Sequence, residues 1–563
     1  MNGQQMGPEN KSFLDRGTLI AMVLVGIVWF GWSKWVETKY PTAKAPQTSV
    51  ASETVADTAK DQGGAGSAGS STAGETGTGG SATTAKTQAP VATETAPETL
   101  EPIATEHWTG QISSHGMAIT QITLKNYTTR DDKPIVIGSA AGGIFATSLL
   151  DGKHPLNFRI EKQGDAKWVG VSNQGAYTVT KEMELVREGE ASGRAMKVST
   201  VVKGDLSQFP GLTTAIADVV QAPASSSFLA PSYDHYDWFV RHEDTNTRTI
   251  INPEKPAALD YKTTMSAALS SHYFTAAIAD QSPLRPEFKG ESVTKKDDKL
   301  LSTGVLAYKP MVKSDEFKTE QVIYVGAKDV KALRAAHMEL AKVIDYGMFA
   351  VIAEPLLWLM RFFFGWFGNW GFAIIGLTIV VRSLVLPFNI YSFKSMKVMQ
   401  QIQPQMQQVR ERYKDDPRRM NEEVMKLMKD NKANPLGGCL PMLLQLPVFF
   451  ALYQVLAMSI DLYRQPFIFW INDLTVKDPF FVLPVLMGIS MFLQQKITPV
   501  ADPQQAKILM WMPVIFSLLM FTLPSGLTLY IFVSTLFGII QQYVLMRDKS
   551  PAQPTKTVRE AKA

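Results

Sequence analysis

The sequence is poor in cysteine: Cys439 is the single one among 563 residues. A disulfide within the chain is therefore excluded, and no pair of cysteines offers metal-ligand spacing. Cys439 stands at the start of an apolar run, where we interpret it as a small packing residue. Residues 234–244 gather acidic and histidine side chains, but their spacing matches no familiar ligand pattern. We interpret them as a hydrated loop rather than a metal site.

The phosphate-binding pattern G-x-x-x-x-G-K-[ST] is also missing, so no motif predicts a bound nucleotide. The net charge is only +4, which by itself gives no reason to expect a specific nucleic-acid partner. No catalytic motif stands out. The sequence therefore predicts a protein without cofactor or metal and without bond-making catalysis.

Large apolar side chains are nearly absent from residues 37–101, which are dominated by Ala, Gly, Ser and Thr. Such a segment buries too little apolar surface to offset the entropy of ordering, so we expect a flexible linker. Residues 1–36 precede it and contain an apolar run with tryptophans near its end. We expect a cytoplasmic N-terminal end followed by an uncleaved transmembrane anchor.

Residues 102–335 carry short runs of alternating apolar and polar side chains, separated by turn signals such as KGD at 203–205. Period-two alternation is typical of half-buried strands. We predict a large extracytoplasmic antiparallel β-sandwich. Residues 328–343 are predicted to form one helix that leads toward the membrane.

Residues 336–370 are predicted to hold connecting and interfacial amphipathic helices. The part from 345 to 368 is rich in Trp and Phe but also carries Glu354, Pro355 and Arg361. It could cross the membrane, but the mixture of charge and aromatic rings favours a helix lying in the interface.

Residues 371–393 form an apolar segment long enough to cross a bilayer, with Arg382 near its centre. A guanidinium there costs about 2.5–3.5 kcal/mol even on lenient insertion scales, and arginine does not lose its proton. Thr378 and Asn389 fall on the same helical stripe. Two interpretations stay open: a structural arginine bound to neighbouring carbonyls, or a cationic, water-filled cavity inside the membrane.

Residues 436–546 contain four further apolar segments, so that with the anchor we expect six spans around a core of five. Polar residues recur in them. Gln445 lies in the first, and Tyr530, Ser534 and Gln541 form one stripe in the last. Hydrogen bonds between helices would explain a few such residues. Together with a central arginine they favour a shared hydrophilic groove.

Residues 394–435 are basic and carry apolar side chains at steps of three and four, interrupted by DDP at 415–417. This pattern predicts a cytoplasmic hairpin of two antiparallel helices, kinked at Pro404. It is either a solvated loop or a docking arm. Residues 547–563 form a basic tail. Because positive loops stay in the cytoplasm, both termini are predicted to lie inside and the β domain outside.

The apolar region carries a series of motifs that together resemble one known family. They are FGNWGF (367–372), LTIVVR (377–382), NPLGGC (434–439), QLPVF (445–449), DPF (478–480), MPVIF (512–516) and LPSGL (523–527). In this order they resemble the YidC/Oxa/Alb family of membrane protein insertases, in its Gram-negative form. The outer domain matches more loosely, through YFTA at 273–276.

The resemblance implies an inner-membrane insertase and chaperone that acts alone or beside the Sec translocon. It implies a groove around Arg382, with Thr378, Asn389, Gln445, Tyr530 and Ser534 as groove residues. It implies an apolar slide for the client helix near Pro447, Phe449, Pro513 and Phe516. The outer domain would be a β-supersandwich that contacts Sec accessory subunits. Other expected partners are nascent membrane proteins, membrane lipids and, weakly through hairpin and tail, the ribosome.

The main alternative function is a transporter or channel for a small anion that uses Arg382 as its binding charge. Secondary transporters usually show internal repeats and paired broken helices, and no repeat is visible among the five core segments. An outer-face enzyme that is merely anchored would need neither six spans nor a buried arginine.

Overall fold

The structure is a computed structural model of the chain. It describes residues 97–140, 142–150, 155–221, 235–252, 258–294, 299–310, 316–431, 440–497 and 503–547. The expected anchor, nearly all of the expected linker, Cys439, Asp234 and the tail beyond 547 lie outside these ranges.

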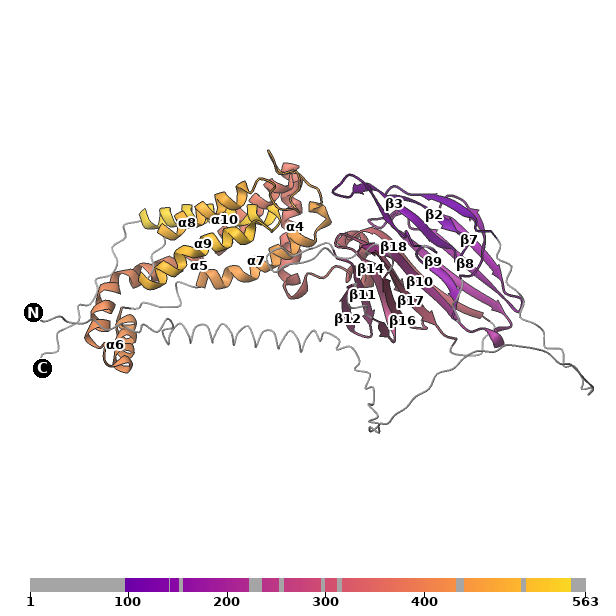
Figure 1. The fold of residues 1–563 in the computed structure, drawn as a ribbon, viewed down its shortest axis with the longest axis horizontal. Helices are drawn as coiled ribbons and strands as arrows, with labels where there is room; N and C mark the ends of the chain where they lie inside the picture. The colour runs from indigo at the N-terminus through magenta and orange to yellow at the C-terminus, as the bar shows by residue number, and fades with distance from the viewer. Residues whose placement is uncertain are drawn as a thin grey trace, which may run out of the picture. The chain divides into compact units, whose positions relative to one another are not determined.

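The alternating segments form three sheets in which all paired strands are antiparallel, as predicted (Figure 1). The first sheet has the order β1-β2-β3-β4, with β1 Leu100–Ala104, β2 Trp108–Ser113, β3 Ala118–Thr128 and β4 Pro134–Ile137. The second has the order β13-β16-β17-β10-β5, with β5 Ala146–Leu149, β10 Leu212–Gln221, β13 Leu259–Tyr261, β16 Glu287–Thr294 and β17 Lys299–Tyr308.

The third sheet has the order β12-β11-β14-β15-β18-β9-β8-β7-β6. Its strands are β6 Arg159–Gln163, β7 Lys167–Asn173, β8 Tyr177–Leu185, β9 Ala195–Gly204, β11 Asp237–His242, β12 Thr245–Ile250, β14 Thr264–Ser270, β15 Phe274–Asp280 and β18 Glu316–Ala327. A short 3-10 turn, η1 Leu206–Gln208, follows β9. The inward side chains of these sheets pack into one apolar core that includes Trp108, Trp168 and Trp238.

The domain begins slightly earlier than its composition suggests. Leu100 and Glu101 already pair with Ser113 and Ile112, so the first strand starts within the expected linker. The strand lies at the edge of its sheet, with Ile103 buried and its other four residues exposed, so it lacks the regular alternation of apolar and polar side chains that marks the other strands.

The prediction of a single helix over residues 328–343 is wrong. The chain instead forms α2 Val330–Ala336 and α3 Met338–Ala341, separated by His337 in an extended conformation. The His337 ring accepts a hydrogen bond from the Glu339 backbone N–H at 3.2 Å, so it begins α3 instead of continuing α2. Both helices pack on the outside of the third sheet.

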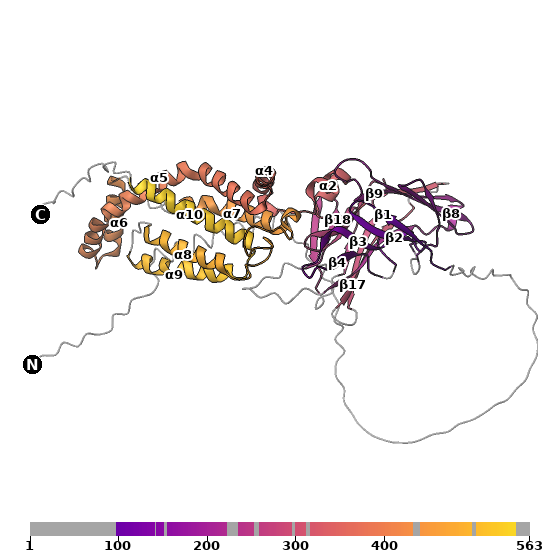
Figure 2. The ribbon, with the colours of Figure 1, turned by 90° about the horizontal axis from the view of Figure 1, so that it is seen from above.

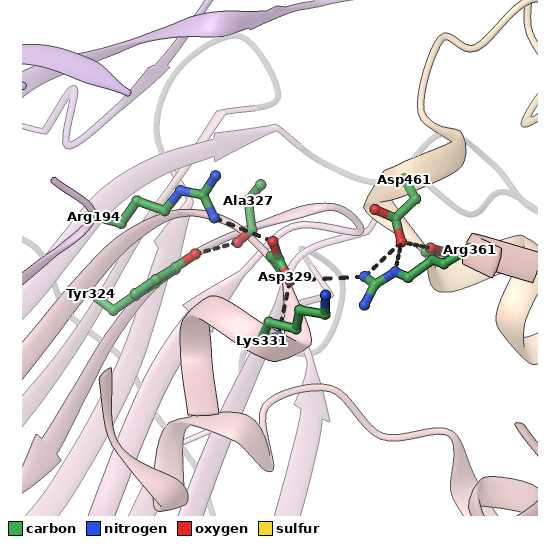
Figure 3. Close-up of polar contacts among 8 residues, drawn as sticks. Arg194, Tyr324, Ala327, Asp329, Lys331, Arg361 and Asp461 are labelled. Atoms are coloured by element: carbon green, nitrogen blue, oxygen red, sulfur yellow. Dashed lines mark hydrogen bonds and ion pairs between the residues drawn. The ribbon is translucent and has the colours of Figure 1, made fainter. Parts of the chain in front are cut away.

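A chain of alternating charges joins the end of the β domain to the helical region (Figure 3). Asp329 lies 3.3 Å from Arg194 and 3.9 Å from Arg361. The Arg361 Nε donates to the Asp461 carboxylate at 2.8 Å. The charge at Arg361, which the sequence left without a partner, is therefore balanced by carboxylates.

The loop after α7 (Leu440–Met458) enters the core of the β domain. It contains the 3-10 turn η4 Ile460–Leu462, whose Ile460 is buried with Tyr463 in the β-domain core. The Tyr463 hydroxyl donates to the Thr128 carbonyl at 2.9 Å. Arg464 donates to the Asp132 carboxylate at 2.6 Å. These contacts connect the C-terminal end of α7 to the first sheet.

The FGNWGF motif makes a sharp turn between two helices. A 3-10 turn, η2 Gly347–Phe349, leads into α4 Ala350–Phe367, which ends at Gly368 in the left-handed conformation, φ 62°. The Asn369 side chain then accepts from the N–H groups of Gly371 and Phe372 and begins α5. Figure 1 shows α4 running across the direction of α5. By length and composition α4 could also span a membrane, so its interfacial position stays a prediction.

The helix α5, Trp370–Arg412, is 43 residues long and joins two segments that the sequence analysis treated separately. The expected boundary at residue 393 is not a break, and the helix continues through Pro387 and Pro404. The second hairpin helix is α6 Pro417–Asp430. Met399, Ile402, Met406 and Leu427 form a buried seam where α6 packs against the end of α5, while the bounds and the cytoplasmic position of the hairpin stay predictions.

The remaining helices are α7, α8 Val482–Ile497, α9 Pro503–Met520 and α10 Ser525–Arg547. α10 packs against α5, α7 and α8, and Figure 2 shows it between α5 and α8. Three helices of the described chain are long and apolar enough to cross a membrane: Gly347–Phe367, Trp370–Arg412 and Ser525–Leu545. Three shorter apolar stretches accompany them, and the number of crossings stays a prediction.

Two other motifs fix the N-terminal ends of α8 and α10. The Asp478 carboxylate of DPF accepts from the Leu483 N–H at 2.7 Å and from the Trp470 ring N–H at 2.9 Å. In LPSGL, the Gly526 N–H donates to the Leu474 carbonyl at 2.9 Å. A Cβ on Gly526 would lie 3.1 Å from that carbonyl oxygen, so a larger residue would crowd this turn.

Candidate functional site

Arg382 meets α10 inside the helical region. Its Nε donates to the Ser534 hydroxyl at 2.6 Å. Ser534 is buried, and Arg382 is half-buried. Among the described residues no carboxylate forms an ion pair with Arg382, although Arg361 has two such neighbours. Within the described ranges the positive charge is thus held by a neutral hydroxyl.

Tyr530 and Gln445 extend this cluster to a third helix. The Gln445 side-chain amide on α7 donates to the Tyr530 hydroxyl at 2.5 Å. Tyr530 is 2% exposed and lies one helical turn before Ser534 on α10. Four of the expected groove residues therefore form two hydrogen-bonded pairs, one turn apart on α10, which make a polar cluster of α5, α7 and α10.

Asn389 lies two turns further along α5, where its Nδ2 donates to the Gln541 Oε1 at 3.2 Å. The pairs Arg382–Ser534 and Asn389–Gln541 are both separated by 152 residues. A constant difference means that α5 and α10 run parallel in a fixed register. The two contacts repeat at one heptad, which corresponds to about 10.5 Å along the helices.

Thr378 does not join this cluster by a hydrogen bond to another helix. Its hydroxyl donates to the Ile374 carbonyl of its own helix at 2.6 Å, and the residue is fully buried. This bond satisfies the hydroxyl locally, as Thr commonly does inside helices. Its place in the groove stays a prediction.

The expected slide residues differ in exposure. Pro447 and Phe449 on α7 and Phe516 on α9 are half-buried, and both phenylalanines pack on the helical core. Pro513 is buried, so it offers no surface to a client in this conformation. The exposed apolar residues of α9 are its neighbours: Met510, Trp511, Met512, Val514, Ile515 and Leu518.

Sequence reasoning missed the direct partners that α10 gives to α5. Gln541 was visible only as part of a polar stripe, and no signal in one sequence fixes the register of two helices 152 residues apart. Sequence reasoning also missed how closely α8 approaches α10. A Cβ on Gly538 of α10 would lie 2.7 Å from the Gln494 Nε2 of α8. Among the described residues no group of His, Cys, Asp and Glu could hold a metal ion.

Two family profiles match the chain. Residues 362–553 match the 60Kd inner membrane protein family, and residues 221–359 match the YidC periplasmic domain. Together they cover the helical region and the second part of the β domain.

Named relatives agree with these matches. A membrane protein insertase YidC from Burkholderia ambifaria is 32% identical over 491 residues, which is 80% of this chain and 86% of that protein. Another, from Geobacter sulfurreducens, is 47% identical over 232 residues, 41% of this chain and 44% of that protein.

The likenesses among solved structures are distant. A crystal structure of an active YidC insertase has a TM-score of 0.35 and 17% identity, covering 79% of this chain and 92% of the other. A putative aldose 1-epimerase from Escherichia coli, with a TM-score of 0.27 and 9% identity, covers 41% of this chain. Alignment with the Burkholderia relative over most of both lengths carries the assignment: this chain belongs to the YidC family of membrane protein insertases.

Proposed function

We propose that the chain inserts client membrane proteins along the polar cluster formed by α5, α7 and α10, which lines a hydrophilic groove. The observation that carries this proposal is the Arg382–Ser534 contact, in which a charge inside an apolar bundle is held by a hydroxyl, with no carboxylate paired to it among the residues that the structure describes. Such a charge can still attract a partner from outside the chain. Membership of the insertase family favours a polypeptide over a small anion as that partner.

The physical task is to bring a polar client tail across an apolar layer. A charge is costly there, and a nearby opposite charge lowers the cost because coulombic attraction is stronger where the dielectric constant is low. Arg382 would compensate an acidic tail transiently. Ser534, Tyr530 and Gln445 would offer hydroxyl and amide groups to neutral polar tails.

The apolar part of the client would leave sideways into lipid. Burial of apolar surface favours this step by roughly 25 cal/mol per Å². The exposed residues around Phe449 and Phe516, such as Phe450, Trp511 and Ile515, would form the slide. In this assignment the client helix contacts α9 at the exposed neighbours of Pro513 and not at Pro513 itself.

The wider arrangement is part of the same proposal. The β domain would lie in the periplasm, with the hairpin α5–α6 and both termini in the cytoplasm. The hairpin and basic tail would attract the ribosome weakly, and the β domain would contact Sec accessory subunits. The exposed aromatic rings of α4, Trp358, Trp366 and Phe367, would meet lipid headgroups. In this arrangement Asn389 is nearer the cytoplasmic end of α5 than Arg382. A tail arriving from the cytoplasm would therefore meet Asn389 first.

The test is insertion without other proteins. Purified full-length chain in liposomes is challenged with a short single-span client, and protease protection of the client tail is measured. We expect protection with the chain and none in empty liposomes. Failure to insert any client, together with a labelled small anion crossing the same liposomes, would favour the transporter alternative.

A further inference from the structure

The second contact between α5 and α10 has hydrogen-bonding capacity left over. Asn389 is 4% exposed and Gln541 is 7% exposed. After their mutual bond, the Asn389 Oδ1 and the Gln541 Nε2 remain buried and have no hydrogen-bond partner among the described residues. A buried polar atom without a partner costs free energy, so an arrangement that leaves two of them side by side needs an explanation.

The two remaining atoms have complementary character. Asn389 Oδ1 accepts a hydrogen bond and Gln541 Nε2 donates one. If the two side-chain amides were turned round together, their mutual bond would still form and would again leave one acceptor and one donor. The pair therefore always presents one group of each kind, which is what a peptide bond also presents.

We propose that Asn389 and Gln541 form a binding site for one backbone amide of the client tail, two helical turns from Arg382 on the cytoplasmic side. This inference rests on the proposed insertion function. The client N–H donates to Asn389 and a client carbonyl accepts from Gln541. Because every peptide bond carries these groups, the site recognises a tail regardless of its sequence, whereas Arg382 responds to its charge.

The surroundings of the pair support a continuous polar path to Arg382. Gly538 lies on α10 between Ser534 and Gln541, and its missing side chain leaves room for the Gln494 amide of α8. Amide groups from three helices thus lie along one heptad of α10. A tail admitted beside the pair can bond to both spare groups while the mutual amide–amide hydrogen bond stays intact.

The experiment is a double-mutant cycle between the chain and the client. Two synthetic single-span clients differ only in their neutral tails, one of glycine and one of sarcosine, which lacks the backbone N–H. Full-length wild type and Asn389→Leu are compared in liposomes at matched amounts of folded protein. Asn389→Ala, which removes the same amide without adding bulk, is measured beside it.

We expect Asn389→Leu to insert the glycine tail about threefold to tenfold less well than wild type, as loss of about one hydrogen bond implies. With the sarcosine tail the ratio should approach one, because the N–H partner is already missing. Gln541→Leu removes the donor and should reduce both tails equally. Thr535→Val is the matched control on α10, since the Thr535 hydroxyl donates to Ile531 of its own helix, and it should change neither tail.

Equal losses on both tails for Asn389→Leu, Asn389→Ala and Gln541→Leu alike would overturn the amide site and leave an interhelical contact only. Unchanged insertion of both tails by all three variants would overturn it as well. If Gln541→Leu, and not Asn389→Leu, loses activity on the glycine tail only, the same site is supported with its two side-chain amides turned round. If wild type inserts neither tail, the proposed function itself fails, which is a different result from variants that match an active wild type.

Discussion

Arg382 is the residue at which charge and shape can be separated most directly. Lysine keeps the positive charge but lacks the planar group that donates to Ser534. We expect Arg382→Lys to retain most insertion activity. Arg382→Ala should lose about tenfold on a client whose tail carries two Asp, equivalent to about 1.4 kcal/mol, and less on a neutral tail. Arg382→Glu should be worst, because it repels an acidic tail.

The measurement uses one client with zero, one or two Asp in its tail, inserted into liposomes at equal amounts of folded variant. A purely structural arginine would lower the amount of folded protein in every variant. Equal fractional losses of Arg382→Ala on all three tails would contradict the electrostatic role.

Lys181 shows the same chemistry in the β domain, with a different purpose. The residue is 1% exposed, and its ammonium donates to the carbonyls of Gly116, Met117 and Phe145 at 2.7–3.0 Å. Burial lowers the pKa of Lys181 to about 7, against about 10.4 for a free lysine. Between these values the unfolded chain binds more protons than the folded one, so stability should rise as pH increases from about 7 to about 10.

The check is thermal unfolding of the full-length chain in detergent across this pH range. Lys181→Met should remove the part of the rise that begins near pH 7 and leave the part due to Lys328, whose pKa burial lowers to about 8. It should also lower the unfolding temperature, because three buried carbonyls lose their donor. Lys203→Met, at a position whose side chain is 68% exposed, should preserve the pH dependence. A wild-type curve that is flat from pH 7 to 10 would show that Lys181 keeps its proton in the fold.

At this scale the sequence identified the residues but not their partners. The cost of an arginine in an apolar segment made Arg382 conspicuous, and the polar stripe on 530–541 was equally visible. Which hydroxyl or amide each would meet depends on the register of α5 against α10. That register is set by packing along both helices, so no local pattern contains it.

Among the elements, the hairpin of α5 and α6 is expected to act as a docking arm outside the core. Its seam is small, with Met399, Ile402, Met406 and Leu427 buried, so it should behave as a semi-independent unit. Removal of one heptad from each helix, 406–412 and 417–423, keeps the turn and the phase of the seam. We expect an intact fold with reduced insertion.

Folding is checked by gel filtration in detergent and activity by insertion into liposomes. If the shortened chain is folded and inserts clients as wild type does, the docking role is wrong and the hairpin is a solvated loop.

The contact between α4 and the loop after α7 offers a second test at the level of elements. Arg361 donates to Asp461 at 2.7–2.8 Å, and their side chains are 24% and 22% exposed. Arg361→Met should weaken this contact by about 1.5–3 kcal/mol, the usual value of a hydrogen bond to a charged group. Amide hydrogen exchange at residues 459–465 should become faster.

Lys318→Met is the matched control, because the Lys318–Glu320 pair is about half exposed on both sides and exposed pairs contribute little. Unchanged exchange in Arg361→Met would mean that burial of Ile460 and Tyr463 holds the loop without the ion pair.

Element types were more predictable than element ends. Alternation revealed strands such as β3, β9, β17 and β18, because their inward residues must be apolar. The break at His337 was hidden, since a ring that caps the next helix looks like any helical histidine. The union of the Arg382 segment with the hairpin was hidden as well. A change from apolar to charged composition marks a change of surroundings, and the backbone of α5 continues through it.

For the whole molecule, orientation is the main expectation still to be tested. We expect the β domain and the hairpin on opposite sides of the membrane. On a Cys439→Ser background, Asp165→Cys in the exposed turn after β6 and Glu422→Cys on α6 place single thiols on each. In intact cells with a permeable outer membrane, an impermeant maleimide should label only the first. Labelling of both or of Glu422→Cys alone would refute the orientation.

The contacts between α5 and α10 join residues that are synthesised at different times. Ser534 and Gln541 are synthesised 152 residues after the groups they bind. At about 5–20 residues per second, roughly 8–30 s pass between them. During that interval Arg382 and Asn389 are already made but lack their partners on α10. The nascent chain is therefore itself a membrane protein whose helix α5 exposes polar groups without hydrogen-bond partners on α10. A ribosome that stops before α10 would leave this helix uncovered permanently, and such a fragment should be a preferred target for membrane proteases.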